Sequence, residues 1–186
     1  EVGAAQVLVA LGHAGVDRRG VHGHVELALL ELLGEVHLAG ELRYGENPQQ
    51  KAWWFRNPCE RGWHDAKILH GKALSYNNLL DLEAAAASLR SFNEPCAVVV
   101  KHNNPCGVGL GDSADDIDMA IDRALRADPM SAFGGIVALN RELDFAGAKF
   151  LSKLFLECIV APAFSPEAMP VLQAKKDLRL LCWPQL

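Results

Sequence analysis

The sequence has no surplus of basic residues, no long apolar run and no closely paired cysteines. Its 186 residues include 18 Lys and Arg against 23 Asp and Glu, a formal net charge of −5. Nucleic-acid-binding proteins usually carry a basic surplus, so this balance argues against a general nucleic-acid partner. No apolar run reaches the ~18 residues of a membrane-spanning helix, so no membrane partner is expected.

The spacing of the cysteines does not indicate a metal site. The five cysteines are widely separated, at positions 59, 96, 106, 158 and 182. No two of them form C-x-x-C, the spacing typical of zinc ribbons and redox-active dithiols, so no metal is predicted. Cys96, Cys158 and Cys182 lie in or beside apolar runs and are interpreted as small core residues. Free thiols are typical of a reducing compartment, which indicates a cytoplasmic protein.

Residues 1–40 differ in character from the rest. They show no clear period except over 25–33, where the pattern predicts an amphipathic helix. The histidines at 13, 22 and 24 are a weak metal signal by themselves, and a solvated, loosely ordered segment is favoured. The chain begins with Glu1 rather than a methionine and shows no signal peptide. We therefore expect a trimmed chain or a piece of a longer reading frame.

After residue 42, buried strands alternate with helices. Apolar runs predict strands over 51–55, 96–100, 136–139, 158–161 and 178–182. Helical patterns cover 79–89, 115–126, 146–156 and 165–175, with Ser165 as a helix cap. Asn78 is predicted to cap the first helix, with Asp81 in the place of the capping-box acid. The alternation predicts a layered α/β domain, a largely parallel sheet with helices on both faces.

Two polar segments precede the first helix. In the segment 43–48, Arg43 offers a planar fork for a phosphate or carboxylate, and Tyr44 can stack on a planar ring. A strand-entry loop with a surface Arg explains the same residues and is the favoured interpretation from physics alone. In the segment 75–78, amides at a helix start suit a polar ligand, although helix capping explains Asn78 as well.

Lys101 and His102 directly follow the buried strand over 96–100. Ligands bind outside the carboxyl ends of strands in open α/β sheets, so these side chains are candidates for catalysis. His can act as a general base near neutral pH, and Lys can stabilise an oxyanion. The following residues 103–107 predict a rigid turn, and a solvated strand end with such a turn is the alternative. His102 and Cys106 resemble part of a zinc-deaminase site, but the second cysteine of P-C-x-x-C is missing.

The paired glycines Gly134 and Gly135 precede the strand over 136–139. Paired glycines allow a ligand or another backbone to approach closely. A simple helix-to-strand turn explains them equally well, so both interpretations stay open.

Five motifs together resemble one family. RYGENP, LSYNNLLDLEAA, VVVKHNNPCG, DPMSAFGGIVALN and ECIVAPAFSPEA occur in this order between residues 42 and 180. They resemble the transformylase region of the family that fuses phosphoribosylaminoimidazolecarboxamide formyltransferase to IMP cyclohydrolase. The resemblance implies that residues 41–186 form the first of two related, cytidine-deaminase-like transformylase subdomains. Residues 1–40 match the family poorly, and the resemblance leads us to expect that the second subdomain and the cyclohydrolase domain are absent from these 186 residues.

The resemblance also implies a reaction in de novo purine biosynthesis. The family transfers a formyl group from 10-formyltetrahydrofolate to aminoimidazole carboxamide ribotide, and a second domain cyclises the product to IMP. By resemblance, His102 accepts the proton of the attacking amine and Lys101 stabilises the transition state. Arg43 and Tyr44 match nucleotide-holding positions. Further positions matching substrate contacts are Asn78, Gly134 and Glu157.

Partners follow from the same resemblance. The family's active site lies between the subunits of a homodimer, and its folate contacts come largely from the second subdomain. We therefore expect the 186-residue chain alone to transfer formyl groups poorly or not at all. Gln49 stands where the family usually has His, which should not remove activity because the main proton acceptor lies elsewhere.

Two functions of other classes compete with this one. A non-catalytic nucleotide-binding or interaction domain would keep Arg43 and Tyr44 for binding without turnover. A zinc deaminase would use His102 and Cys106. Tight ribotide binding without turnover would favour the first, and stoichiometric zinc would favour the second.

Overall fold

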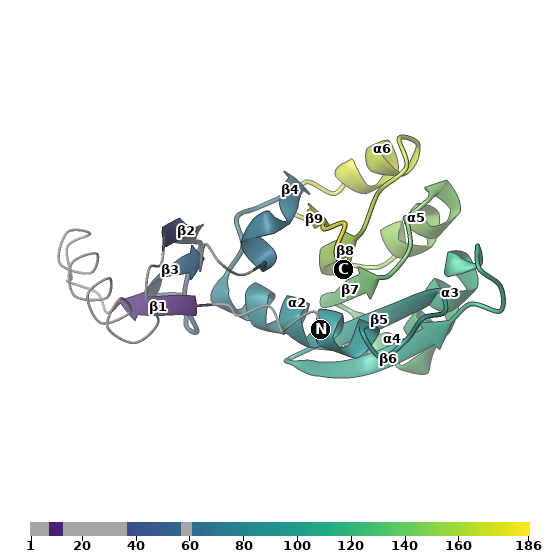
Figure 1. Ribbon diagram of the computed structural model, residues 1–186, viewed down its shortest axis with the longest axis horizontal. Helices are drawn as coiled ribbons and strands as arrows, with labels where there is room; N and C mark the ends of the chain where they lie inside the picture. The colour runs from purple at the N-terminus through teal and green to yellow at the C-terminus, as the bar shows by residue number, and fades with distance from the viewer. Residues whose placement is uncertain (1–7, 13–36, 57–60) are drawn as a thin grey trace. The chain divides into compact units, whose positions relative to one another are not determined.

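The structure is a computed structural model that describes residues 8–12, 37–56 and 61–186 (Figure 1). The chain divides into two compact units. The first comprises Glu1–Asp65 with Ala73–Leu79, and the second Ala66–Lys72 with Leu80–Leu186. The helix predicted over 25–33, the three early histidines and Cys59 lie outside the described residues.

A small antiparallel sheet forms the first unit's described part. Its strands are β1 (Leu8–Gly12), β2 (His37–Leu42) and β3 (Lys51–Arg56), with β3 in the middle. The strand predicted over 51–55 is thus confirmed. Ala52, Trp53 and Phe55 of β3 are buried, and the single-turn 3₁₀ helix η1 (Trp63–Asp65) follows with Trp63 buried.

The second unit contains a mixed six-stranded sheet. Its strand order is β4 (Lys67–His70), β9 (Arg179–Cys182), β8 (Leu156–Ala161), β7 (Gly135–Leu139), β5 (Cys96–Lys101) and β6 (Asn104–Leu110). Only β7–β8 and β8–β9 pair in parallel; the other neighbours are antiparallel. The predicted α/β class is confirmed, but the prediction of a largely parallel sheet is wrong. A continuous apolar run signals burial on both faces of a strand and does not encode its direction.

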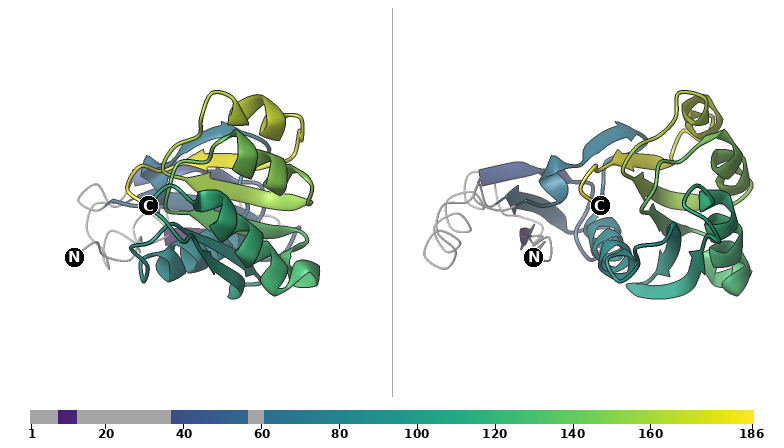
Figure 2. Two further views of the ribbon diagram at one scale, coloured as in Figure 1. Left: turned by 90° about the vertical axis from the view of Figure 1, so that its right-hand side faces the viewer. Right: turned by 45° about the vertical axis from the view of Figure 1, so that its right-hand side comes forward.

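The helices of the second unit cover the sheet. The helices α3 (Ile117–Ala127), α5 (Phe145–Ser152) and α6 (Ala168–Gln173) share one core with alternate sheet residues such as Val99, Val137 and Ile159. The short helix α4 (Pro129–Ala132) joins this layer through Ala132. The intervening sheet residues, Val98 and Val100 among them, are equally buried. They face the other side of the sheet, where Figure 2 shows residues 80–89 of α2 (Tyr76–Leu89).

The helix α2 begins three residues earlier than its sequence pattern predicts. Ser75, not Asn78, caps it: the Asn78 N–H donates to Ser75 Oγ at 3.2 Å, and the Ser75 N–H donates to Asn78 Oδ1 at 3.1 Å. This reciprocal pair is a capping box with Asn in the place of the usual acid. Asp81 therefore does not cap this helix.

The later helices are shorter than predicted. The helix α5 ends at Ser152, because Leu156 already belongs to β8. The helix α6 begins at Ala168 with Glu167 in the cap position, so Ser165 does not cap it directly. Ser165 Oγ instead accepts the Ala168 N–H in the turn before the helix. Over the described ranges, no helix is long and apolar enough to span a membrane.

Asp118 at the start of α3 is expected to cost the fold stability at neutral pH. Its Oδ1 is buried and has no hydrogen-bond partner among the described residues. Burial chiefly raises the pKa of Asp118 above its usual 3.8, and the nearby Asp144 and Asp116 raise it further. The carboxyl binds its proton more tightly in the folded state, so the penalty is absent below pH ~4 and grows as the pH rises through the folded pKa.

Asp118→Asn should therefore raise the free energy of unfolding by about 1 kcal/mol at pH 7. The gain should shrink toward zero as the pH falls to ~4. Denaturant unfolding at several pH values measures this difference. The control is Asp122→Asn on the same helix, where the carboxylate pairs with Arg126 at 2.9 Å and removal should not stabilise. A gain for Asp118→Asn that is independent of pH would contradict the electrostatic explanation.

Candidate active site

A two-residue hairpin turn carries His102. Strands β5 and β6 pair through Lys101 and Asn104, and His102 and Asn103 form the turn with φ of 52° and 62°. Positive φ at both central residues is the conformation of a type I′ turn, which matches the twist of the flanking strands. The rigid turn predicted over 103–107 is thus shorter, because Pro105 and Gly107 already lie in β6. The hairpin leaves the His102 side chain exposed to solvent.

Lys101 and Gly134 meet beside this turn. The Lys101 ammonium donates to the Phe133 carbonyl oxygen at 2.5 Å. Gly134 adopts φ of 70°, and its N–H donates to the Phe155 carbonyl oxygen at 2.7 Å. A Cβ at Gly134 would lie 2.8 Å from Lys101 Nζ, so only glycine leaves this position open to the ammonium. The structure thus brings together Lys101, which follows the strand over 96–100, and Gly134 of the paired glycines.

The sheet register explains this meeting. Because β5 runs antiparallel to β7, the carboxyl end of β5 lies beside the amino end of β7, with Val100 opposite Ile136. The parallel pairing of β7 and β8 places Glu157 at the same edge of the sheet. The site therefore combines the carboxyl end of one strand with the amino ends of two others. A parallel sheet would have placed these segments at opposite edges.

Glu157 pairs with a buried arginine. Its carboxylate accepts a hydrogen bond from Arg179 on β9 at 2.7 Å, and the Arg179 side chain is only 2% exposed. No motif pointed to Arg179, since a single Arg in a short apolar strand carries no local signal. The neighbouring Cys158 is fully buried, and burial raises the pKa of its thiol to about 12. Cys158 therefore stays a neutral core residue, as its sequence context predicts.

Asp81 reaches the hairpin turn from α2. Its Oδ1 accepts the Asn103 N–H at 2.6 Å. Burial raises the pKa of Asp81, while this hydrogen bond and the charges of His102 and Lys101 act in the opposite direction. Sequence reasoning assigned Asp81 to helix capping and missed this contact, because the contact depends on how α2 packs against the end of β5.

In the first unit, two polar motifs lie side by side. The Arg43 N–H donates to the Leu74 carbonyl at 2.7 Å, and the Tyr76 N–H donates to the Tyr44 carbonyl at 3.1 Å. The Arg43 guanidinium lies over the Tyr44 ring, 5.3 Å from its centroid. Arg43 is exposed and Tyr44 partly so, whereas Asn78 is buried in the capping box. Arg43 and Tyr44 thus present charge and a ring to solvent, and capping already accounts for Asn78.

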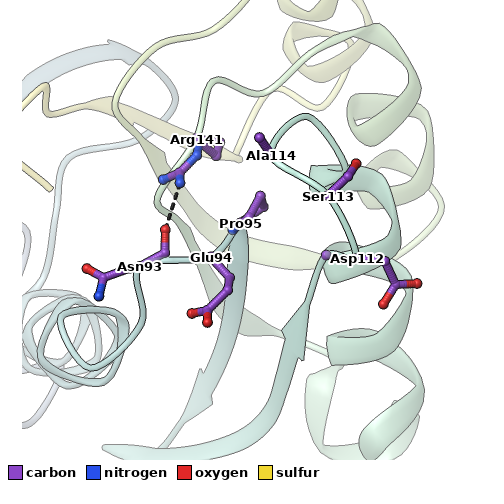
Figure 3. Close-up of a pocket in the computed structure, with 8 residues that line it drawn as sticks. Asn93, Glu94, Pro95, Asp112, Ser113, Ala114 and Arg141 are labelled. Atoms are coloured by element: carbon purple, nitrogen blue, oxygen red, sulfur yellow. Dashed lines mark hydrogen bonds between the residues drawn. The ribbon is translucent and has the colours of Figure 1, made fainter.

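A hollow of about 350 Å³ lies at the other end of β5 (Figure 3). Its lining comes from residues 93–95 before β5, residues 111–114 after β6, and Arg141. The Arg141 guanidinium donates to the carbonyls of Asn93 and Asn140 at 2.7 and 2.9 Å. None of the predicted site residues lines this hollow, and Arg141 is engaged in holding the surrounding loops.

The described residues show no group of three or more His, Cys, Asp or Glu side chains arranged to hold a metal ion. Cys106, the candidate zinc ligand, points its thiol at the Val99 carbonyl, 3.5 Å away within the hairpin. Burial chiefly raises the pKa of the Cys106 thiol. Because a thiolate is the form that binds zinc, this environment does not favour metal ligation by Cys106.

Known proteins are similar to this sequence over most of its length. The family model described as "AICARFT/IMPCHase bienzyme" matches residues 23–186. A bifunctional purine biosynthesis protein PurH of Parasynechococcus marenigrum is 54% identical over 169 residues, covering 88% of this chain and 32% of the relative. The PurH protein of Halalkalibacterium halodurans is 55% identical over 146 residues, covering 77% and 28%. The chain thus spans about a third of the length of these curated relatives.

Among solved structures, Acinetobacter baumannii RibD aligns with 46% of this chain and 28% of its own, at 20% identity and a TM-score of 0.39. The family match covers most of the chain and includes all seven predicted site residues, from Arg43 to Glu157. The chain therefore belongs to the AICARFT/IMPCHase bienzyme family.

Proposed function

We propose that this chain contributes the catalytic base and the oxyanion-stabilising lysine of a formyltransferase in de novo purine biosynthesis. The acceptor is aminoimidazole carboxamide ribotide and the donor is 10-formyltetrahydrofolate. The observation that carries the proposal is that the exposed His102 directly follows Lys101 at the carboxyl end of β5, where the Lys101 ammonium lies beside the Phe133 carbonyl. Membership of a family named for this reaction supports the choice of substrates.

The two side chains fit the two demands of formyl transfer. The acceptor amine is a weak nucleophile, so His102 takes its proton as the nitrogen attacks the formyl carbon. The formyl oxygen gains negative charge in the tetrahedral intermediate, and the Lys101 ammonium stabilises that charge. The bond from the formyl carbon to the folate nitrogen then breaks, and that nitrogen takes up a proton. The formyl group thereby moves from one nitrogen to the other without oxidation or reduction.

The remaining predicted residues complete the proposal. Arg43 binds the ribotide phosphate and Tyr44 stacks on its ring, for which the exposed fork and ring in the first unit provide support. Asn78, Gly134 and Glu157 are proposed as further substrate contacts, although each also has a structural role in the fold. No metal takes part. The reaction takes place in the cytoplasm, in a homodimer.

The proposal also covers the domain organisation. Residues 41–186 form the first of two cytidine-deaminase-like transformylase subdomains, and residues 1–40 lie before it. The relatives that match are between three and four times as long as the matched stretch. They have the room for the second subdomain and for a cyclohydrolase domain that closes the ring to IMP. The 186-residue chain by itself is therefore expected to transfer formyl groups slowly or not at all.

A full-length chimera tests the proposal. In it, this chain replaces the matching region of the Parasynechococcus marenigrum relative, with the present numbering kept for the exchanged residues. Arg43→Ala should weaken ribotide binding about 10- to 100-fold in calorimetry, because a charge-assisted contact to the phosphate is lost. The matched control is Arg56→Ala, an exposed arginine at the end of β3, which should leave binding unchanged.

Equal binding by the Arg43→Ala and parent chimeras would contradict the phosphate role of Arg43. Tight ribotide binding by a chimera that shows no formyl transfer would contradict the catalytic proposal. That result would favour the non-catalytic nucleotide-binding domain.

A further inference from the structure

The carboxylate of Asp81 has no role in the proposed chemistry or in capping its own helix. Ser75 and Asn78 form the capping box of α2, so Asp81, the sixth residue of the helix, is not needed there. Its side chain is only partly exposed. A partly buried carboxylate that contacts a residue outside its own helix indicates a specific interaction.

That partner is the turn that carries His102. Left-handed backbone at non-glycine residues costs energy, and type I′ turns favour Asn-Gly or Asp-Gly for this reason. Here the turn sequence is His-Asn, with φ of 52° and 62° and no glycine. From the first residue of β6, the Asn104 side-chain amide supports the turn by donating to the His102 carbonyl at 2.9 Å. His and Asn tolerate left-handed backbone better than most residues, so the cost here is modest, and a contact from outside the turn can hold it in this one conformation.

Asp81 supplies that support from outside the hairpin. Its Oδ1 lies 2.6 Å from the Asn103 nitrogen, a short charge-assisted hydrogen bond. Burial raises the pKa of Asp81, and this hydrogen bond and the Lys101 ammonium act in the opposite direction. The contact therefore joins α2 to the residue next to the catalytic base, through a backbone group that any residue at position 103 except proline would offer.

We propose that Asp81 is a positioning residue for formyl transfer: its carboxylate holds the His102–Asn103 turn in its left-handed conformation and so aims the His102 imidazole. This inference rests on the proposed function of His102. Its consequence is specific. Loss of the contact should let the turn relax and misplace the base, while the ribotide-binding residues in the first unit keep their local structure.

Three substitutions in the full-length chimera test the proposal. Asp81→Ala should lower kcat about 10- to 100-fold and change KM for the ribotide less than about threefold. Asp81→Asn should recover most of kcat, because its amide oxygen can still accept the Asn103 N–H. The control Glu83→Ala removes an acid from the same helix whose carboxylate pairs with Arg90 at 3.3 Å, and it should leave kcat unchanged.

A second measurement addresses the contact without catalysis. Amide hydrogen exchange in the 186-residue chain should show the Asn103 N–H protected, with at least tenfold faster exchange in Asp81→Ala and near-parent exchange in Asp81→Asn. Equal exchange in all three proteins would overturn the proposed contact. Unchanged kcat in Asp81→Ala, or an Asp81→Asn as slow as Asp81→Ala, would overturn positioning through this hydrogen bond.

The His102→Ala chimera separates the two proposals. Loss of transfer in His102→Ala together with unchanged kcat in Asp81→Ala would leave the proposed function standing and overturn the role of Asp81. Full transfer in His102→Ala would overturn the proposed function and the catalytic role of Asp81 with it. The exchange measurement would still decide whether Asp81 holds the turn.

Discussion

Replacing His102 by alanine in the full-length chimera is expected to lower formyl transfer about 100- to 10,000-fold, the range that general bases contribute. The side chain is exposed at the hairpin turn and leaves no cavity when removed. The free energy of unfolding should therefore change little. Single-turnover assays with ribotide and 10-formyltetrahydrofolate measure the loss, and thermal unfolding checks the fold.

A second substitution guards against a backbone effect at this position. Alanine at φ of 52° keeps some strain, whereas asparagine tolerates left-handed backbone well and cannot act as a base near neutral pH. His102→Asn should thus be as inactive as His102→Ala and at least as stable. Near-normal transfer by either variant would contradict the role of His102 as proton acceptor.

Gly134→Ala is expected to lower transfer about 100-fold, comparable to the loss of one oxyanion-stabilising group. The new Cβ would lie 2.8 Å from Lys101 Nζ, and the flexible lysine would move away from the Phe133 carbonyl. The left-handed φ of 70° would also cost about 1–3 kcal/mol of stability with a side chain present. Kinetics and thermal unfolding of the chimera measure the two effects separately.

The Lys101→Met substitution shows whether Gly134 acts through the ammonium. In a double-mutant cycle, Gly134→Ala should have little further effect on transfer once Lys101 has been replaced. The stability loss should persist in the double variant, because it arises from the backbone at residue 134. Additive losses in transfer would instead indicate that Gly134 contacts the substrate independently of Lys101.

Local patterns predicted most elements but not their arrangement. The apolar run CAVVV correctly predicted a buried strand, yet only the pairing of β5 with β7 shows that this strand runs antiparallel. Strand direction depends on long-range pairing, which a run of apolar residues does not encode. The start of α2 was missed for a similar reason. Both Ser75 and Asn78 are good capping residues, and their reciprocal hydrogen bonds place the cap at Ser75.

The sequence by itself predicted the α/β class, the family and a catalytic role for Lys101 and His102, because these predictions depend on composition and on residues adjacent in the chain. Tertiary structure decided what surrounds them. The contact of Gly134 with Lys101, the pairing of Glu157 with Arg179 and the hydrogen bond of Asp81 to Asn103 join residues 22 to 33 positions apart. Such contacts arise from sheet register and helix packing, where burial and hydrogen bonding across the whole unit select one arrangement. The lack of a basic surplus, of long apolar runs and of C-x-x-C pairs argued against several classes of protein, and the structure adds the contact of Asp81 with the turn that carries His102.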